Sequence, residues 1–189
     1  MSRDKILQNI KMNNQGFNKT AYPVYHPIHR VQPSEYVETY GQFVKANRAK
    51  FIIVDHPDDI PGKVQDCFPN AKNVYSSLNG NLVPIDHDKI QEIDLAIIQG
   101  SYGVANNGAT WVRDKDLFDR SIPFLCQYLT IVISADHLYA DLYEAYQKID
   151  PDDQSYGVFI SGPSKTGDIE QALVIGAHGP LELLVVVVK

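Results

Sequence analysis

Short, unbroken apolar runs alternate along the chain with segments in which apolar residues recur every three to four positions. The runs predict buried β-strands, at residues 51–54, 72–75, 94–98, 108–112, 129–134, 157–161 and 183–188. The periodic segments predict amphipathic α-helices, at residues 2–14, 34–44, 60–68, 136–149 and 168–176.

Strands that alternate with helices in this way are typical of a mainly parallel sheet with helices on both faces. The sequence therefore predicts a three-layer α/β/α fold. We expect one domain over residues 1–189, of which residues 1–33 form an N-terminal helix and a proline-rich connector. Pro23, Pro27 and Pro33 disfavour helix in that connector.

Charge and cysteine content narrow the function classes. The formal charge of −6, from 17 basic and 23 acidic residues, does not favour nucleic acid or an anionic membrane as a partner. The longest apolar run, residues 183–188, is far shorter than the roughly 20 residues of a membrane helix. Cys67 and Cys126 stand alone, which predicts no disulfide framework, zinc site or iron–sulfur cluster within this chain. We expect a cytoplasmic protein without a metal of its own.

Residues 161–168, Ser-Gly-Pro-Ser-Lys-Thr-Gly-Asp, follow a predicted strand and open a predicted helix. Loops after the strands of a parallel sheet often bind ligands. Backbone N–H groups at a helix N-terminus, together with a lysine, suit a phosphate or a carboxylate. The candidate ligand-binding residues here are Gly162, Ser164, Lys165, Thr166 and Gly167. The spacing matches neither a Walker A loop nor GxGxxG, and a helix capped by Asp168 and Gln171 is an equally good interpretation.

Two further loops carry candidate residues. In residues 99–111, Ser101, Asn106 and Asn107 are candidate ligand contacts, although Asn107-Gly108 more strongly indicates a turn between two strands. In residues 176–180, His178 is a candidate acid–base group, although the two glycines there also suit a simple turn. The catalytic residues are unknown, and the only nearby candidates are His178, Asp168 and Glu170.

Residues 159–170 (FISGPSKTGDIE) and 173–180 (LVIGAHGP) resemble the C-terminal signature of the LUD-domain family, the LutC/YkgG lactate-utilisation group. Residues 103–108 (GVANNG) are similar to the family's other glycine motif. The resemblance implies a sheet of the NagB/RpiA/CoA-transferase-like type. It also implies a role in oxidising L-lactate to pyruvate, with iron–sulfur clusters on LutA/LutB-like partner proteins and no cofactor in this chain.

The chain departs from the family pattern at three places. Asn106 and Asn107 stand where the family usually has an acidic residue followed by threonine or serine. Lys165 stands where arginine is common, and Leu181 where the residue is often basic. If the family's carboxylate binds a cation or moves a proton, this chain lacks that group.

Two classes of function follow from the sequence. The first is a LutC-like subunit or accessory protein of lactate utilisation that binds a small carboxylate or phosphate-bearing ligand at residues 161–168. The alternative is a free-standing enzyme or ligand-binding module of the NagB/RpiA/CoA-transferase-like superfamily, acting on a phosphorylated or CoA-type ligand. Whether this chain is itself an enzyme, and whether it forms a homo-oligomer, stays open at this point.

Overall fold

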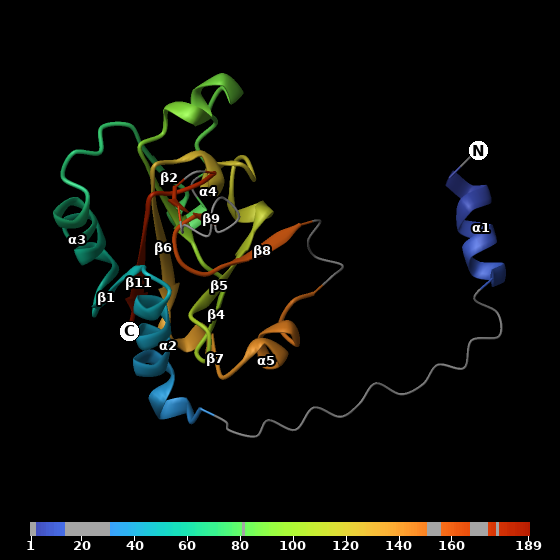
Figure 1. Ribbon diagram of the computed structural model, residues 1–189, viewed down its shortest axis with the longest axis horizontal. Helices are drawn as coiled ribbons and strands as arrows, with labels where there is room; N and C mark the ends of the chain where they lie inside the picture. Colours follow the sequence, from blue (N-terminus) through green and yellow to red (C-terminus); the bar gives the residue numbers. More distant parts are fainter. Residues whose placement is uncertain (1–2, 14–30, 81, 151–155, 167–173, 177) are drawn as a thin grey trace.

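A five-stranded parallel sheet forms the centre of the computed structural model, which describes residues 3–13, 31–80, 82–150, 156–166, 174–176 and 178–189 (Figure 1). Its strands are β1 (Lys50–Val54), β2 (Val74–Ser76), β3 (Leu95–Gln99), β6 (Tyr128–Ser134) and β11 (Glu182–Val188). They lie in the order β1-β11-β6-β3-β2, and every neighbouring pair is parallel. The prediction of an α/β fold with a mainly parallel sheet is confirmed.

The two longest strands, β6 and β11, lie side by side inside this sheet. Val185 of β11 lies opposite Ile131 of β6 on one side and Phe51 of β1 on the other. Each strand buries five consecutive residues. Strands covered on both faces carry apolar residues at successive positions rather than at alternate ones, which is why these unbroken runs were recognisable in the sequence.

Helix α3 (Ile60–Cys67) covers one face of the central sheet (Figure 1). Its buried residues Ile60 and Val64 pack with Leu184 and Val186 of β11. The apolar residues of α3 recur at helical spacing, so a single stripe contacts the sheet. The helix predicted over residues 60–68 is confirmed.

The opposite face of the central sheet is covered by α2 (Tyr36–Ala46), α4 (Ile122–Leu125) and a second sheet. Tyr40 and Val44 of α2 and Ile122 of α4 are buried in this larger core, together with Ile131 and Val185 of the central sheet. Both faces of the central sheet are therefore covered.

The second sheet was not expected from the sequence. Its strands are β4 (Tyr102–Val104), β5 (Ala109–Arg113), β7 (Leu138–Tyr139) and β8 (Gly157–Ile160), in the order β7-β4-β5-β8. β5 pairs antiparallel with both β4 and β8. The strands predicted at residues 108–112 and 157–161 exist, but they belong to this antiparallel region and not to the parallel sheet.

The helix predicted over residues 136–149 is wrong for most of its length. Leu138 and Tyr139 form β7, paired with β4, and only α5 (Leu142–Tyr146) is α-helical. The Asp141 carboxylate accepts a hydrogen bond from the backbone N–H of Glu144 at 2.9 Å, which starts α5 at that point. Tyr146, expected to lie on a packed face, is exposed.

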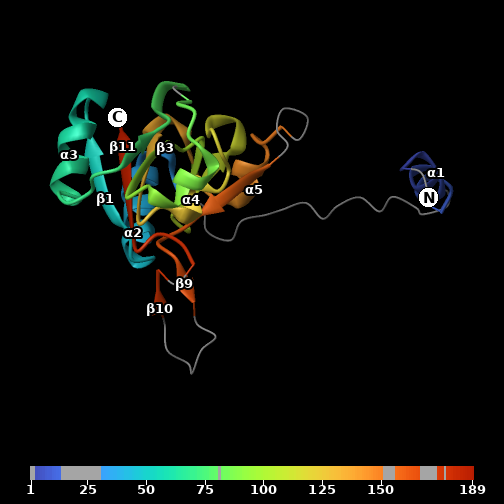
Figure 2. The ribbon, with the colours of Figure 1, turned by 90° about the horizontal axis from the view of Figure 1, so that it is seen from above.

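Of the helices predicted near the two ends of the chain, one is found among the described residues and one is not. α1 (Arg3–Asn13) forms as predicted but buries none of its residues, and residues 14–30 of the connector lie outside the described residues. A short 3-10 turn (Pro33–Glu35) leads into α2. The helix predicted over residues 168–176 is wrong where it is described, because Val174–Ile175 form the strand β10, antiparallel to β9 (Lys165–Thr166). These two short strands project away from the larger sheets (Figure 2).

Candidate functional site

The loop after β8 and the loop before β11 bond directly to each other. The backbone N–H of Ser164 donates to the Pro180 carbonyl at 3.0 Å, and the N–H of Gly176 donates to the Ser164 carbonyl at 3.1 Å. The described parts of the two segments that carry the family resemblance, residues 159–166, 174–176 and 178–180, thus form one structural unit.

This unit lies at the amino ends of the central strands. The backbone N–H of Leu181, just before β11, donates to the carbonyl of Gln127, just before β6, at 2.8 Å. Residues 161–166 follow β8 of the second sheet, so the expectation of a loop at the carboxyl edge of the parallel sheet was wrong. Nor do Lys165 and Thr166 open a helix, since they form β9.

A cavity of about 200 Å³ lies beneath this unit. It is lined by Pro123, Phe124, Leu129, Val158, Phe159, Ile160, Gly162, Pro163, Ser164, His178, Gly179 and Pro180. Three of the predicted site residues, Gly162, Ser164 and His178, are therefore brought together around one space. A larger hollow of about 520 Å³ adjoins it and shares Phe124, His178 and Gly179 with it.

Gly162 is the tightest point of the loop. Its φ of +80° is in the left-handed region, and a Cβ at this position would lie 2.3 Å from the Asn47 carbonyl oxygen and 2.8 Å from the Lys165 Nζ. Only glycine fits such a position without displacing its neighbours. The ammonium group of Lys165 therefore lies against the backbone of Gly162, which places a positive charge beside the cavity.

The side-chain amide of Asn47, at the C-terminal end of α2, joins the two predicted loops. It donates to the Asn107 carbonyl at 2.8 Å and to the Ser161 Oγ at 2.9 Å. Asn47 was not among the predicted site residues. An asparagine at the end of a periodic helical segment is a helix-termination signal, but nothing local connects it to residues 107 and 161.

Residues 104–109 form a turn between β4 and β5, as Asn107-Gly108 in the sequence indicated. The Asn107 Oδ1 accepts from the Ala109 N–H at 2.9 Å, so this side chain stabilises its own turn. Neither Asn106 nor Asn107 lines the cavity.

Ser101 lies at the other end of β4 from Asn106 and Asn107. It is buried, and its Oγ donates to the Asp116 carboxylate at 3.3 Å. The same carboxylate accepts from the Arg113 Nε at 2.6 Å. Ser101 is thus part of a separate polar cluster, and it does not line the cavity beneath the loop of residues 161–166.

Three of the other candidates cannot be placed. Gly167, Asp168 and Glu170 lie outside the described residues, as does the side chain of Thr166. Among the residues that are described, no three histidines, cysteines or acidic residues gather closely enough to hold a metal ion. In the same part of the chain, no helix has the length and apolar character needed to cross a membrane.

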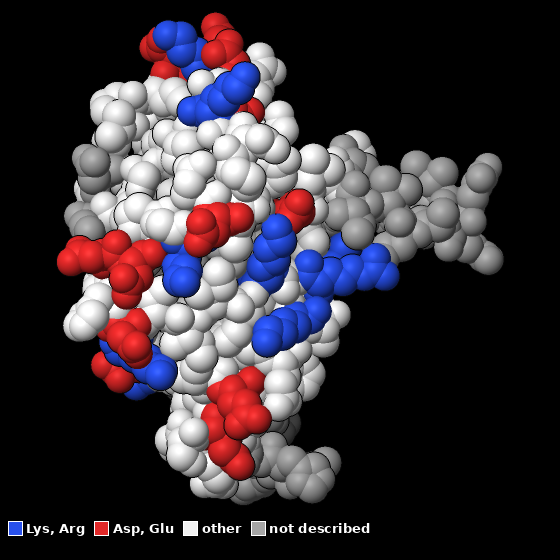
Figure 3. Space-filling view, turned by 90° about the vertical axis from the view of Figure 1, so that its left-hand side faces the viewer, with Lys and Arg blue, Asp and Glu red and all other residues white. Residues whose placement is uncertain are grey.

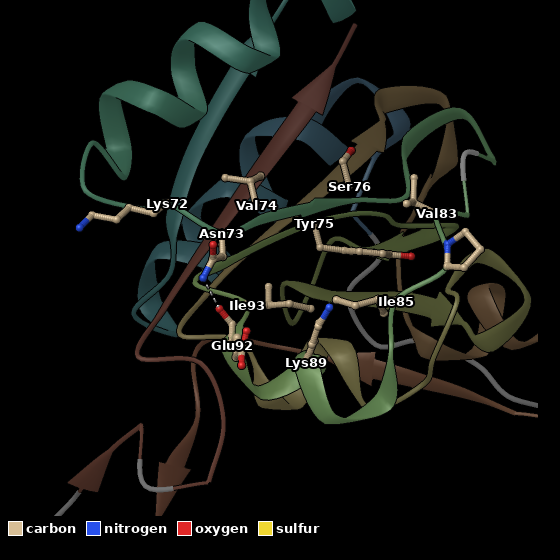
Figure 4. Close-up of a pocket in the computed structure, with 11 residues that line it drawn as sticks. Lys72, Asn73, Val74, Tyr75, Ser76, Val83, Ile85, Lys89, Glu92 and Ile93 are labelled. Carbon is tan, nitrogen blue, oxygen red and sulfur yellow. Dashed lines mark hydrogen bonds between the residues drawn. The ribbon is translucent and has the colours of Figure 1, made fainter.

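A further hollow of about 500 Å³ runs beside β2, at the edge of the central sheet (Figure 4). Tyr75, Ile85 and Ile93 line it, with Lys89 and Glu92 from the neighbouring 3-10 turn (His87–Glu92). It contains none of the predicted site residues.

Acidic and basic side chains are interspersed over the surface that carries α3 (Figure 3).

The two cysteines differ in accessibility. Cys126 is 2% exposed, and burial raises the pKa of its thiol to about 12, whereas Cys67 is partly exposed. We expect an alkylating reagent at pH 8 to modify one thiol per native chain, at Cys67, and two after unfolding in denaturant. Intact-mass spectrometry counts the additions, and Cys67→Ser should leave a native chain with none. Rapid native modification at Cys126 would contradict this prediction.

The sequence of this chain also matches a known protein family. The family profile described as "LUD domain" matches residues 64–188. The chain belongs to the LUD-domain family. The match includes both loops of the candidate site, and the family resemblance identified from the sequence is confirmed.

Relatives of this LUD-domain protein carry the name "Lactate utilization protein C". One from Oceanobacillus iheyensis is 21% identical over 99% of this chain and 98% of its own length. One from Shouchella clausii is 32% identical over 50% of this chain and 44% of its own length. A crystal structure of a DUF162 family protein from Deinococcus radiodurans has a TM-score of 0.66 at 15% identity, covering 84% of this chain and 99% of that one. At that identity the likeness concerns the fold alone.

Proposed function

We propose that this protein is a LutC-like component of a lactate-utilisation system and binds a small anion at the loop of residues 161–166. The observation that carries the proposal is the similarity to a lactate utilization protein C along nearly the full length of both chains. The oxidation of L-lactate to pyruvate removes two electrons and two protons, so the system needs an electron acceptor.

The acceptor in this proposal is an iron–sulfur centre on a partner protein of the LutA/LutB type. Such clusters are held by several cysteine thiolates. Cys67 packs on the α3 side of the central sheet and Cys126 in the core on its other side, and the chain has no further cysteine. The residues of this chain therefore do not fit a cluster, and a redox partner becomes part of the proposal.

The anion site rests on charge and backbone geometry. Lys165 supplies a cation beside Gly162, and Ser164 and His178 supply polar groups on the cavity wall. A phosphate or carboxylate would be attracted to this position. An exposed ion pair contributes only modestly, on the order of 0.2–1 kcal/mol.

Affinity purification tests the partner. Tagged full-length protein, recovered from the source organism grown on lactate, should bring down cysteine-rich proteins that mass spectrometry identifies and that contain iron and acid-labile sulfide. The same purification from cells grown on glucose is the control. If the protein comes down without any iron–sulfur protein in both cases, the proposed lactate-utilisation partnership fails.

Thermal-shift titration with lactate, pyruvate, inorganic phosphate, CoA and ATP tests the ligand. Lys165→Ala should weaken the binding of lactate or phosphate about 1.4- to fivefold. Lys63→Ala, on the opposite face of the central sheet in α3, is the matched control and should change nothing. Stabilisation by CoA or ATP alone would instead favour the free-standing enzyme.

A further inference from the structure

The cavity beneath the loop is mainly apolar. An apolar lining does not help to bind an inorganic anion. Of its twelve lining residues, only Ser164 and His178 have polar side chains. Phe124, Leu129 and Phe159 form part of the wall. Burying an unpaired charge among such groups is unfavourable, so the inner part of the cavity suits hydrocarbon.

The size of the cavity restricts what can enter it. Its volume of about 200 Å³ is below the ~300–1,000 Å³ of typical sites for drug-sized ligands. A nucleotide or a CoA moiety would not fit inside it. A short aliphatic chain would.

The polar groups lie where a charged end of such a ligand would remain in contact with water. His178 is exposed and lines both the cavity and the adjoining hollow. A Cβ on Gly179, which also lines both spaces, would lie 3.4 Å from the Ser164 Oγ and 3.7 Å from the Phe124 carbonyl oxygen. Ser164, Gly179 and Phe124 therefore meet at the junction of the two spaces.

We propose that this cavity binds the aliphatic tail of a short-chain monocarboxylate, with the carboxylate held at the junction by Ser164 and His178. The inference rests on the proposed binding of a small anion at this loop and specifies its class: a carboxylate with a tail longer than the methyl group of lactate. Each methylene that moves from water into the cavity should increase affinity about threefold to fourfold.

Isothermal titration of the full chain with a homologous series tests this ligand class. The ligands are lactate, 2-hydroxybutyrate and 2-hydroxyvalerate, with butyrate, valerate and inorganic phosphate as separate arms. We expect affinity to rise about threefold to fourfold per methylene along each carboxylate series. The difference between the hydroxy acids and the plain acids of equal length reports whether the 2-hydroxyl group is recognised.

Two variants test the apolar wall and the contact to the carboxylate separately. Phe124→Ala removes part of the apolar wall and should reduce the gain per methylene, whereas Phe118→Ala, which removes a similarly exposed ring outside the cavity, should not. Ser164→Ala should weaken all the acids by a similar factor and leave the gain per methylene intact. Circular dichroism checks that each variant is folded.

The outcomes distinguish this inference from the function on which it depends. If lactate and phosphate bind but affinity does not change with chain length, the apolar-tail proposal is overturned and anion binding stands. If no acid and no phosphate binds, the proposed ligand function fails as well. A length dependence that survives Phe124→Ala unchanged would place the tail somewhere else and also overturn the proposal.

Discussion

Replacing Gly108 with alanine should lower the free energy of unfolding by about 2–5 kcal/mol. Gly108 has a φ of +68°, and a Cβ there would lie 2.7 Å from the backbone N of Val44 and 2.8 Å from the carbonyl carbon of Phe43. The left-handed conformation costs a residue with a Cβ about 1–2 kcal/mol. Overpacking adds about 1–3 kcal/mol, because the contacted atoms belong to the backbone of α2. Urea denaturation followed by circular dichroism measures the change.

Gly80 is the matched control for this substitution. Its φ is +73°, close to that of Gly108, but a Cβ there would meet nothing within 4 Å. Gly80→Ala should therefore cost only the conformational part, about 1–2 kcal/mol. Equal losses for the two variants would show that the turn between β4 and β5 does not press against α2.

The close approach at Gly108 also matters for the candidate site. It lets the β4–β5 turn lie against α2, where the Asn107 carbonyl accepts the hydrogen bond from the Asn47 side chain. The same Asn47 amide donates to Ser161, at the start of the loop of residues 161–166. Gly108→Ala should therefore reduce ligand binding as well as stability, whereas Gly80→Ala should leave binding unchanged.

The elements that the sequence predicted correctly are those whose pattern is determined by local burial. Strands β6 and β11 are buried on both faces and are unbroken apolar runs, and α3 presents one apolar stripe to the sheet. Helix α5 shows the opposite case. Leu138, Leu142 and Tyr146 recur at helical spacing, but the pairing of Leu138 with Gly103 of β4 takes Leu138 out of the helix. Such a pairing depends on a strand more than 30 residues away, which no local pattern reveals.

The candidate site was predictable to a similar extent. Gly162, Ser164 and His178 occur in two segments close in sequence, and the structure brings all three to one cavity. Ser101 and Asn107 were grouped because they share one loop in the sequence, yet the strand β4 separates them. Asn47 and Phe124 come from distant elements and reach the site only through the tertiary fold, so the sequence alone gave no reason to include them.

Replacing Tyr40 with alanine should be at least as damaging as Gly108→Ala, with a loss of about 3–5 kcal/mol. Tyr40 is fully buried on α2. Its ring packs edge-on against Phe51 of β1 with centroids 6.1 Å apart, and its hydroxyl is hydrogen-bonded to the Thr110 Oγ1 of β5 at 2.5 Å. One side chain thus connects α2 to both sheets. Urea denaturation of the variant measures the loss.

A double-mutant cycle separates the hydroxyl group from the ring. Burial raises the pKa of the Tyr40 phenol well above its usual value, so the group remains protonated across the neutral range. Tyr40→Phe leaves the buried Thr110 hydroxyl without this partner and should cost about 1–3 kcal/mol. Thr110→Val should cost a similar amount, and the double variant should lose less than the sum of the two, because the second substitution removes the group that the first left unpaired. Strictly additive losses would show that the Tyr40–Thr110 hydrogen bond does not hold α2 against the second sheet.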